Sequence, residues 1–349
     1  MSTKARIPVG IIGASGYTGA DLVRLLAMHQ HAEIRVVTAN SHAGKTMAEV
    51  FPHLGGLSLP KLIETDAADW ASVEAVFCCL PHGTSQEVIA ALPSNIKIID
   101  LSADFRLRNA VTYKDWYGHE HRALHLQSSA VYGLTEFHRE EISSARLVAC
   151  PGCYPTAALL ALLPLIYGRA VDPDDVIIDA KSGATGAGRS LKEETLFCEV
   201  AEGIHPYGIA RHRHAPEIEQ EMSVAANKEV VVNFTPHLMP MNRGELLTIY
   251  ARLAPSMSVE DARGLLVDRY ADEQFVRVVD PGVVPSTRHI RGSNYCLIGI
   301  FADRVPGRII IVSVLDNLDK WSSGQAIQNF NLMFGLEEKI GLEQQPLFP

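Results

Sequence analysis

The feature that most constrains the fold is a glycine-rich turn between two apolar segments near the N-terminus. Residues Ile7 to Ile12 form a short apolar run that predicts a strand, and Ala20 to Leu26 carries apolar side chains at helical spacing. Between them lies Gly13-Ala14-Ser15-Gly16-Tyr17-Thr18-Gly19. Three glycines in such a turn allow a tight bend, close approach of the backbone to a ligand, and close packing of the helix.

A turn of this kind is suited to binding a pyrophosphate group. Backbone N–H groups and the positive end of the helix dipole both favour an anion at the start of a helix. The spacing is G-x-x-G-x-x-G rather than G-x-G-x-x-G, so a turn whose glycines serve packing alone remains the alternative. The residues that we expect to bind a dinucleotide are Gly13, Ser15, Gly16, Tyr17, Thr18 and Gly19.

The end of the second expected strand, Glu33 to Ala39, indicates which dinucleotide binds. An NAD site places an acidic residue there to bind the ribose hydroxyls. Here the strand runs into Thr38-Ala39-Asn40-Ser41-His42-Ala43-Gly44-Lys45, which has hydroxyl, amide and cationic groups but no acid. These groups suit the 2′-phosphate of NADP, so we expect Asn40 and Ser41 to bind NADP(H). A polar loop without a ligand is the alternative.

The order of expected strands and helices divides the chain into two domains. Up to about residue 150, strands alternate with helices, which predicts an α/β, Rossmann-type parallel sheet. Beyond it strands dominate, Val230 to Phe234 among them, which is typical of an α+β domain with a mostly antiparallel sheet. We assign 1–152 and 317–349 to the NADP-binding domain, to which a C-terminal helix returns. Residues 153–316 are assigned to a catalytic, substrate-binding and oligomerisation domain.

Composition and charge exclude several classes of protein. A chain of 349 residues that is 47% hydrophobic and 20% charged supports a sizeable core and is not a disordered chain. Its 31 Lys+Arg and 40 Asp+Glu give a net charge of −9, which argues against nucleic acid as a partner. The longest apolar run, Ala157 to Ile166, is far shorter than the ~20 residues of a membrane span. Six cysteines and no signal-peptide core predict a cytoplasmic protein.

Cys153 lies between a short expected strand, Arg146 to Cys150, and the start of a long apolar helix. Its context is Pro151-Gly152-Cys153-Tyr154-Pro155-Thr156. A helix N-terminus lowers the pKa of a thiol and so increases the fraction of reactive thiolate. Cys153 is therefore a candidate nucleophile, with a capping or packing thiol as the alternative.

Three further side chains are candidates for acid–base chemistry and anion binding. His212 and His214 are two positions apart, so both would face the same side of an extended segment, and imidazole titrates near neutral pH. No carboxylate or cysteine stands at ligand spacing with them, so we expect no metal. Arg106, in a turn after the expected strand Ile96 to Leu101, could bind a phosphate through two parallel hydrogen bonds, with Asp104 orienting it. A surface ion pair is the alternative.

Four segments appear in a specific order: Gly13 to Gly19, Ser102-Ala103-Asp104-Phe105-Arg106, Pro151 to Thr156, and His212-Arg213-His214-Ala215-Pro216-Glu217-Ile218. Together they resemble the N-acetyl-γ-glutamyl-phosphate reductases of arginine biosynthesis, a family related to the aspartate-semialdehyde dehydrogenases. The resemblance extends through Gly292-Ser293-Asn294 to Asp316-Asn317-Leu318 and so covers nearly the whole chain.

The resemblance implies an NADPH-dependent reduction of a small-molecule acyl phosphate to an aldehyde, through a thioester on Cys153. It implies that His214 is the acid and base, with His212 the close alternative and a substrate contact. It also implies a homodimer or homotetramer, with no nucleic acid or membrane partner. The other residues that it assigns are Arg106 and Glu217 at the substrate, Ser182 at the substrate and cofactor, and Gly183 and Asn317 at the nicotinamide.

Other functions stay open at this point. The same chemistry on aspartyl or aminoadipyl phosphate is one alternative. An NADP-binding regulator without turnover would use the glycine turn, but it would leave Cys153, His214 and Arg106 without a joint role. A structural subunit whose glycines serve packing is a third.

Overall fold

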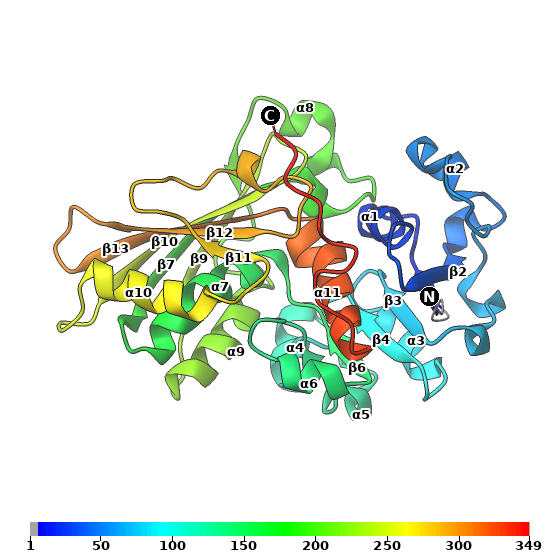
Figure 1. The fold of residues 1–349 in the computed structure, drawn as a ribbon, viewed down its shortest axis with the longest axis horizontal. Helices are drawn as coiled ribbons and strands as arrows, with labels where there is room; N and C mark the ends of the chain where they lie inside the picture. Colours follow the sequence, from blue (N-terminus) through cyan, green and yellow to red (C-terminus); the bar gives the residue numbers. More distant parts are fainter. Residues whose placement is uncertain (1–5, 349) are drawn as a thin grey trace, which may run out of the picture. The chain divides into compact units, whose positions relative to one another are not determined.

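Two separate sheets organise the chain, and each belongs to its own structural unit (Figure 1). The computed structural model describes residues 6–348. The first unit runs up to Pro151 and includes Ser322–Glu343, and the second contains Gly152–Trp321 together with the segment from Gln344. That last segment, expected in the first domain, joins the second unit because Leu347 N–H donates to the Arg291 carbonyl at 2.8 Å.

The sheet of the first unit is parallel at every strand pairing and has the order β2-β1-β3-β4-β6-β5. Its strands are β1 (Ile7–Ile12), β2 (Ala32–Thr38), β3 (Ala75–Cys78), β4 (Lys97–Asp100), β5 (Val131–Tyr132) and β6 (Leu147–Ala149). The order reverses between β1 and β3, because β2 lies on one side of β1 and the later strands lie on the other. In such sheets the ligand binds at this switch point, outside the carboxyl ends of the strands. The predicted Rossmann-type fold is confirmed.

Helices cover both faces of this parallel sheet. They are α1 (Tyr17–Leu26), α2 (Met47–Val50), α3 (Ser85–Ala91), α4 (Ala110–Tyr117), α5 (Leu124–Gln127), α6 (Arg139–Ser144) and α11 (Gly324–Met333). Successive side chains of β3 point to opposite faces. Val76 and Cys78 share a buried cluster with Ile89 of α3, whereas Phe77 meets Phe330 of α11 with ring centroids 5.5 Å apart. The C-terminal helix therefore completes the core of the first unit.

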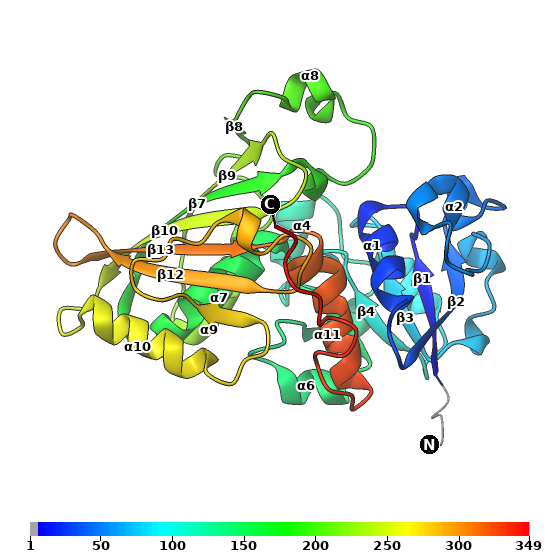
Figure 2. The same cartoon turned by 45° about the horizontal axis from the view of Figure 1, so that its top comes forward.

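The sheet of the second unit has the order β11-β12-β13-β10-β7-β9-β8 (Figure 2). Its strands are β7 (Val171–Gly183), β8 (His205–Pro206), β9 (Asn233–Met239), β10 (Glu245–Leu253), β11 (Val276–Val278), β12 (Cys296–Ala302) and β13 (Arg308–Leu315). The β11–β12 and β7–β9 pairs are parallel and the other pairs are antiparallel, so the expected mostly antiparallel sheet is confirmed.

The helices of the second unit are α7 (Cys153–Tyr167), α8 (Phe197–Val200), α9 (Ala215–Ala226) and α10 (Val259–Tyr270). Helix α7 is buried along almost its whole length and packs against β7, β10 and β13, with α9 and α10 beside it. It faces the buried side of β10, where Leu247, Ile249 and Ala251 alternate with partly exposed residues. Within residues 6–348, no helix combines the length and the apolar character needed to cross a bilayer.

The strand expected at Val230 to Phe234 is wrong in position, because β9 begins at Asn233 and continues to Met239. The N–H of Val230 donates to the Ser223 hydroxyl at 2.9 Å, and that of Val232 donates to a Glu219 carboxylate oxygen at 3.2 Å. Both acceptors belong to α9. The backbone of Val230 and Val232 is therefore bonded to this helix rather than to a neighbouring strand, although β-branched residues favour a strand.

Candidate active site

The glycine turn follows β1 at the switch point of the parallel sheet. Gly13 has a φ of +79°, and a Cβ there would lie 2.6 Å from the Cys79 carbonyl oxygen. A Cβ on Gly19 would lie 2.6 Å from the Cα of Ala14. Gly16, the N-cap of α1, has no such neighbour, since a Cβ there would come no closer than 3.7 Å to any atom considered. Packing thus requires Gly13 and Gly19, while Gly16 leaves open space at the helix start, where an anion binds.

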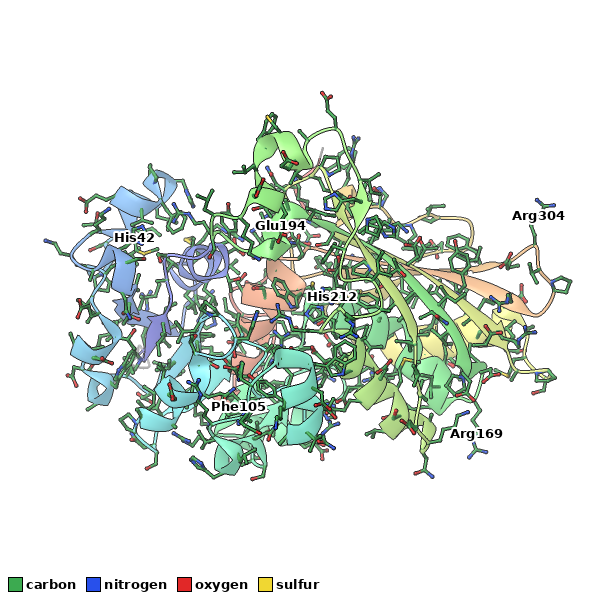
Figure 3. The ribbon with its side chains drawn as sticks, turned by 180° about the vertical axis from the view of Figure 1, so that it is seen from behind. His42, Phe105, Arg169, Glu194, His212 and Arg304 are labelled. Atoms are coloured by element: carbon green, nitrogen blue, oxygen red, sulfur yellow. The ribbon has the colours of Figure 1, made fainter. Side chains whose placement is uncertain are left out.

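The other residues expected to bind the dinucleotide surround this turn and the end of β2. Ser15 is half-buried, Tyr17 begins α1 and is 37% exposed, and the Thr18 hydroxyl accepts a hydrogen bond from Ser322 at 3.0 Å. Asn40 and Ser41 are exposed just after β2, next to His42, which is labelled in Figure 3.

Two contacts fix the segment after β2. The side-chain oxygen of Asn40 accepts hydrogen bonds from the Thr65 N–H and hydroxyl, at 3.1 and 3.2 Å. The Ser41 hydroxyl lies 3.0 Å from Nδ1 of His42. This segment carries no acidic side chain that would repel a 2′-phosphate.

Arg106 is buried in the first unit rather than lying on its surface, with a relative exposure of 5%. Its Nε donates to the carbonyl of Cys150 at 2.7 Å, and Nη2 donates to the carbonyl of Leu101 at 3.1 Å. Asp104 accepts hydrogen bonds from the Gly83 N–H at 2.7 Å and from the Tyr113 hydroxyl at 2.6 Å. Arg106 therefore holds the backbone just after β4 and just after β6. The carbonyl that it binds after β6 belongs to Cys150, which lies three residues before Cys153 in the chain.

Helix α7 begins at Cys153 itself, with Gly152 as its N-cap, whereas the sequence predicts that Cys153 lies in the turn before the helix. The thiol is buried, and no acidic residue lies in the first turn of the helix. A carboxylate oxygen of Glu217, on α9, accepts the Gly152 N–H at 2.7 Å and so anchors the helix start. The exposed N–H groups of a helix start favour the thiolate form of a cysteine placed there.

The imidazole of His214 lies directly over this helix start. A Cβ at position 152 would be 2.5 Å from Nε2 of His214, so only glycine admits the ring at this distance. Gly152 immediately precedes Cys153, which brings the ring next to the nucleophile candidate. Of the two histidines, His214 is therefore better placed to exchange protons at the substrate.

His212 is held in a different way. This residue is labelled in Figure 3. Its Nδ1 accepts the N–H of His214 at 3.1 Å, and its ring packs against Tyr154, Tyr207 and Phe234. Burial lowers the pKa of His212 to about 4, so this ring is neutral at physiological pH. The two histidines lie in a turn before α9 rather than in the extended segment that the sequence analysis assumed, yet their ring centroids are 4.8 Å apart.

Ser182, Gly183 and Asn317 meet at one end of the second sheet. Ser182 is buried near the end of β7, and a Cβ on Gly183 would lie 2.7 Å from the Asn242 carbonyl oxygen. The Asn317 side chain accepts the Gly244 N–H at 2.7 Å and donates to the Thr185 hydroxyl at 2.9 Å. Asn317 therefore joins the loops after β7 and before β10.

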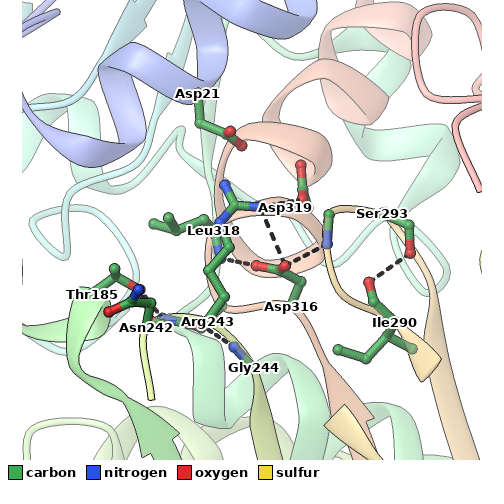
Figure 4. A network of polar contacts seen from close by, with 12 residues as sticks. Asp21, Thr185, Asn242, Arg243, Gly244, Ile290, Ser293, Asp316, Leu318 and Asp319 are labelled. Carbon is green, nitrogen blue, oxygen red and sulfur yellow. Dashed lines mark hydrogen bonds and ion pairs between the residues drawn. The ribbon is translucent and has the colours of Figure 1, made fainter. Parts of the chain in front are cut away.

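An ionic network supports the same loops. Nη1 of Arg243 lies 3.3 Å from a carboxylate oxygen of Asp316 and 3.0 Å from one of Asp319 (Figure 4). Asp316 also accepts the N–H groups of Gly292 and Leu318, at 2.7 and 2.9 Å. Over residues 6–348, no three His, Cys, Asp or Glu side chains gather in a way that could hold a metal ion.

Sequence reasoning missed Glu245, the first residue of β10. It is fully buried on the face of β10 that packs against α7, and its pKa is affected by the Cys153 thiol. A signal was present, because Glu245 occupies the first position of an alternation that continues with Leu247, Ile249 and Ala251. A carboxyl group at a position otherwise reserved for core side chains is a candidate for function.

The matches to known proteins agree with this division into two units. Residues 8–145 match the family described as "Semialdehyde dehydrogenase, NAD binding domain", and residues 153–317 match "Semialdehyde dehydrogenase, dimerisation domain". An N-acetyl-gamma-glutamyl-phosphate reductase from Rhodospirillum rubrum is 58% identical over 349 residues, covering 99% of each chain. The chain belongs to the N-acetyl-γ-glutamyl-phosphate reductase family.

Other members of the N-acetyl-γ-glutamyl-phosphate reductase family extend to plants. A probable chloroplastic reductase of this name from Arabidopsis thaliana is 56% identical over 343 residues, which cover 98% of this chain and 86% of the relative. The predicted family, and with it the prediction of an oxidoreductase, is thereby confirmed. The predicted dinucleotide cofactor is confirmed as well.

Solved structures support the fold of this reductase at much lower identity. Aspartate semialdehyde dehydrogenase II from Vibrio cholerae, complexed with ASA, has a TM-score of 0.71 at 16% identity over 95% of this chain and 99% of its own. Aspartate semialdehyde dehydrogenase with NADP from Candida albicans has a TM-score of 0.67 at 16% identity, covering 96% and 100% of the two chains.

Proposed function

We propose that the chain reduces N-acetyl-γ-glutamyl phosphate to N-acetylglutamate 5-semialdehyde and phosphate, through a thioester on Cys153, in arginine biosynthesis. The observation that carries this proposal is the start of α7, where Cys153 follows a glycine over which His214 packs. The names of the relatives support the choice of substrate.

The first half of the reaction forms the thioester. The Cys153 thiolate attacks the acyl carbon, an S–C bond forms, and the C–O bond to phosphate breaks with its electron pair leaving on phosphate. The positive end of α7 stabilises the thiolate before attack. We assign the leaving phosphate to Arg106, whose guanidinium also donates to the carbonyls of Cys150 and Leu101 and is thereby held beside the chain that leads into α7.

The second half of the reaction reduces the thioester. The glycine turn around Gly16 would hold NADPH, which would supply the hydride for the acyl carbon. His214 gives a proton to the oxygen of the forming thiohemiacetal and takes it back when the C–S bond breaks, so Cys153 leaves as thiolate. A neutral His212 fits a role as a hydrogen-bond partner of the substrate, since its Nδ1 already accepts the His214 N–H.

The remaining predicted residues take supporting roles. Glu217 holds the Gly152 N–H, which supports a role in positioning Cys153 next to the substrate. Ser182 and Gly183 border the bound acyl group and the nicotinamide, and Asn317 holds the loops that carry them. Asn40 and Ser41, with the rest of an acid-free segment after β2, select NADP(H) over NAD(H).

The second unit, which matches a dimerisation domain, is proposed to form a homodimer or homotetramer. Thr248 and Tyr250 of β10 lie opposite Val312 and Ile310 of β13, on the sheet face turned away from α7. All four side chains are only partly buried in the single chain. A second copy seated on this face would bury them, and sedimentation of Tyr250→Glu beside wild type tests this.

We place the protein in the cytoplasm, although its plant relatives are named chloroplastic.

The proposal is tested by following NADPH loss with N-acetyl-γ-glutamyl phosphate, aspartyl phosphate and aminoadipyl phosphate. We expect turnover with the first and at most weak turnover with the others. If another acyl phosphate were turned over faster, that compound would be the substrate in place of N-acetyl-γ-glutamyl phosphate. NADPH binding without any turnover would favour a regulator.

The role of Arg106 is tested separately. Arg106→Leu, compared with Arg106→Lys, is expected to raise the Michaelis constant of the acyl phosphate, and a normal constant would refute the role of Arg106.

A further inference from the structure

Glu245 is a carboxyl group in an apolar setting. It is 0% exposed, and it continues the buried side of β10 formed by Leu247, Ile249 and Ala251. Its strand neighbours are Ser182 on β7 and Leu315 on β13. No N–H or O–H group of residues 6–348 donates a hydrogen bond to either of its carboxylate oxygens.

A carboxylate in such a place is costly. Removing an ionised group from water without compensating hydrogen bonds strongly favours its neutral form. An apolar side chain would pack at position 245 without this cost, as Leu247 and Ile249 do two and four residues further on. Packing alone therefore does not explain the choice of glutamate.

Cys153 lies close enough to Glu245 for its thiol to affect the pKa of this carboxyl group. The interaction with the Cys153 thiol lowers the pKa of Glu245, against the larger effect of burial. Burial raises the pKa of both Tyr154 on α7 and Tyr207 after β8, and the nearby charge of Glu245 raises both further. Their hydroxyls lie 2.8 Å apart. The carboxyl group thus lies near the reactive thiol and a pair of phenols that stay neutral.

We propose that Glu245 accepts the proton of the Cys153 thiol when the thiolate forms. This inference rests on the proposed function, in which Cys153 is the nucleophile. The S–H bond breaks, an O–H bond forms on Glu245, and the sulfur electron pair then attacks the acyl carbon as phosphate leaves. When the thiohemiacetal collapses and sulfur leaves again as thiolate, Glu245 returns the proton to it.

The pairing solves a problem of charge in a buried site. Deprotonating the thiol to solvent would add a negative charge to an apolar pocket, whereas transfer to an ionised Glu245 moves an existing charge from oxygen to sulfur. Burial raises the pKa of Glu245 to about 8, so this carboxyl group can both take up and release a proton near neutral pH. His214 is then left to serve the substrate oxygen.

The test is the pH dependence of Cys153 alkylation by iodoacetamide, which needs neither substrate nor turnover. All proteins carry Cys198→Ser, because Cys198 is an exposed thiol, and modification of Cys153 is followed by peptide mass spectrometry. The protein with native Glu245 is compared with Glu245→Gln and Glu245→Asp. Glu219→Gln is the matched control, since burial also raises the pKa of this carboxyl on α9.

We expect the same alkylation midpoint with native Glu245 and in the Glu219→Gln control. In Glu245→Gln the midpoint should rise by about one unit or more, which makes alkylation below the midpoint roughly tenfold slower. Glu245→Asp should lie between them. A Glu245→Gln profile that coincides with that of the control, or has a lower midpoint, overturns the proposal.

A second measurement applies if Glu245→Gln does not fold. The infrared band of a protonated carboxyl is titrated with native Cys153 and in Cys153→Ala. Because the thiol lowers the pKa of Glu245, its loss should move the titration of that band to higher pH, and an unmoved titration overturns the pairing. Failure of the proposed function can be told apart from failure of the Glu245 proposal. If the proposed function is wrong, no acyl phosphate is turned over, whether or not the alkylation profiles differ between the variants.

Discussion

The ring of His214 occupies the space where any residue other than glycine at position 152 would carry its Cβ, 2.5 Å from Nε2. Gly152 is also the N-cap of α7, and its N–H is held by Glu217 at 2.7 Å. One small residue therefore connects the helix start, the acid–base candidate and the carboxylate that anchors the backbone.

Gly152→Ala tests this connection. The backbone angles of residue 152, φ −72° and ψ 164°, suit alanine, so the fold should survive while the His214 ring is displaced. We expect kcat to fall by ~10²–10⁴, the contribution of a positioned acid and base, with NADPH affinity unchanged. Gly264→Ala, on α10 with open space around it, is the control. Full activity in Gly152→Ala would mean that His214 is not required at this position.

His214→Asn should show a similar loss of ~10²–10⁴ in kcat, because it removes the proton donor itself. His212→Asn keeps an acceptor for the His214 N–H and should retain more activity, with its main effect on the Michaelis constant of the acyl phosphate. Steady-state kinetics of both variants separate the two roles. The reverse order of effects would exchange them.

Gly16→Val addresses the cofactor. A Cβ at residue 16 meets no atom within 3.7 Å, so the fold should tolerate the substitution, whereas a dinucleotide at the start of α1 should not. We expect NADPH affinity to fall at least tenfold, or by about 1.4 kcal/mol. Fluorescence titration with NADPH measures this, and circular dichroism checks the fold. An unchanged dissociation constant for NADPH would show that the Gly13 to Gly19 turn is not part of the binding site.

His212 should contribute to the pH dependence of stability. Burial lowers its pKa from 6.5 to about 4, so the unfolded chain binds its proton first as the pH falls. Its stabilising contribution is complete above pH 6.5, declines as the pH falls, and is lost below about pH 4, a change of about 3 kcal/mol. Urea unfolding between pH 7 and 4 should therefore show a weaker pH dependence in His212→Asn than in wild type. Equal slopes would contradict the burial of a neutral ring.

Much of the first unit could be predicted from the sequence because its signals are local. The Gly13 to Gly19 turn and the strands around it depend on residues adjacent in the chain. Strand β9 shows the limit of such reasoning. The backbone of Val230 and Val232 is held by side chains of α9, which a local pattern does not reveal.

In the site, too, the residues in local motifs could be predicted and those placed by long-range contacts could not. Cys153 and His214 stand in recognisable motifs, whereas the burial of Arg106 depends on the ends of β4 and β6 coming together. Glu245 reaches the start of α7 only because β10 lies in the sheet against which that helix packs. Long-range pairing of this kind leaves no mark in the sequence beyond one polar residue in an apolar alternation.

Mass spectrometry of the enzyme mixed with N-acetyl-γ-glutamyl phosphate, without NADPH, tests the central claim most directly. Without a hydride the reaction should stop at the thioester, so one phosphate per chain should be released and the N-acetylglutamyl group should be found on the peptide with Cys153. Cys153→Ser should release no such burst of phosphate. An acyl group on another residue, or no acylation with full turnover when NADPH is added, would contradict the account.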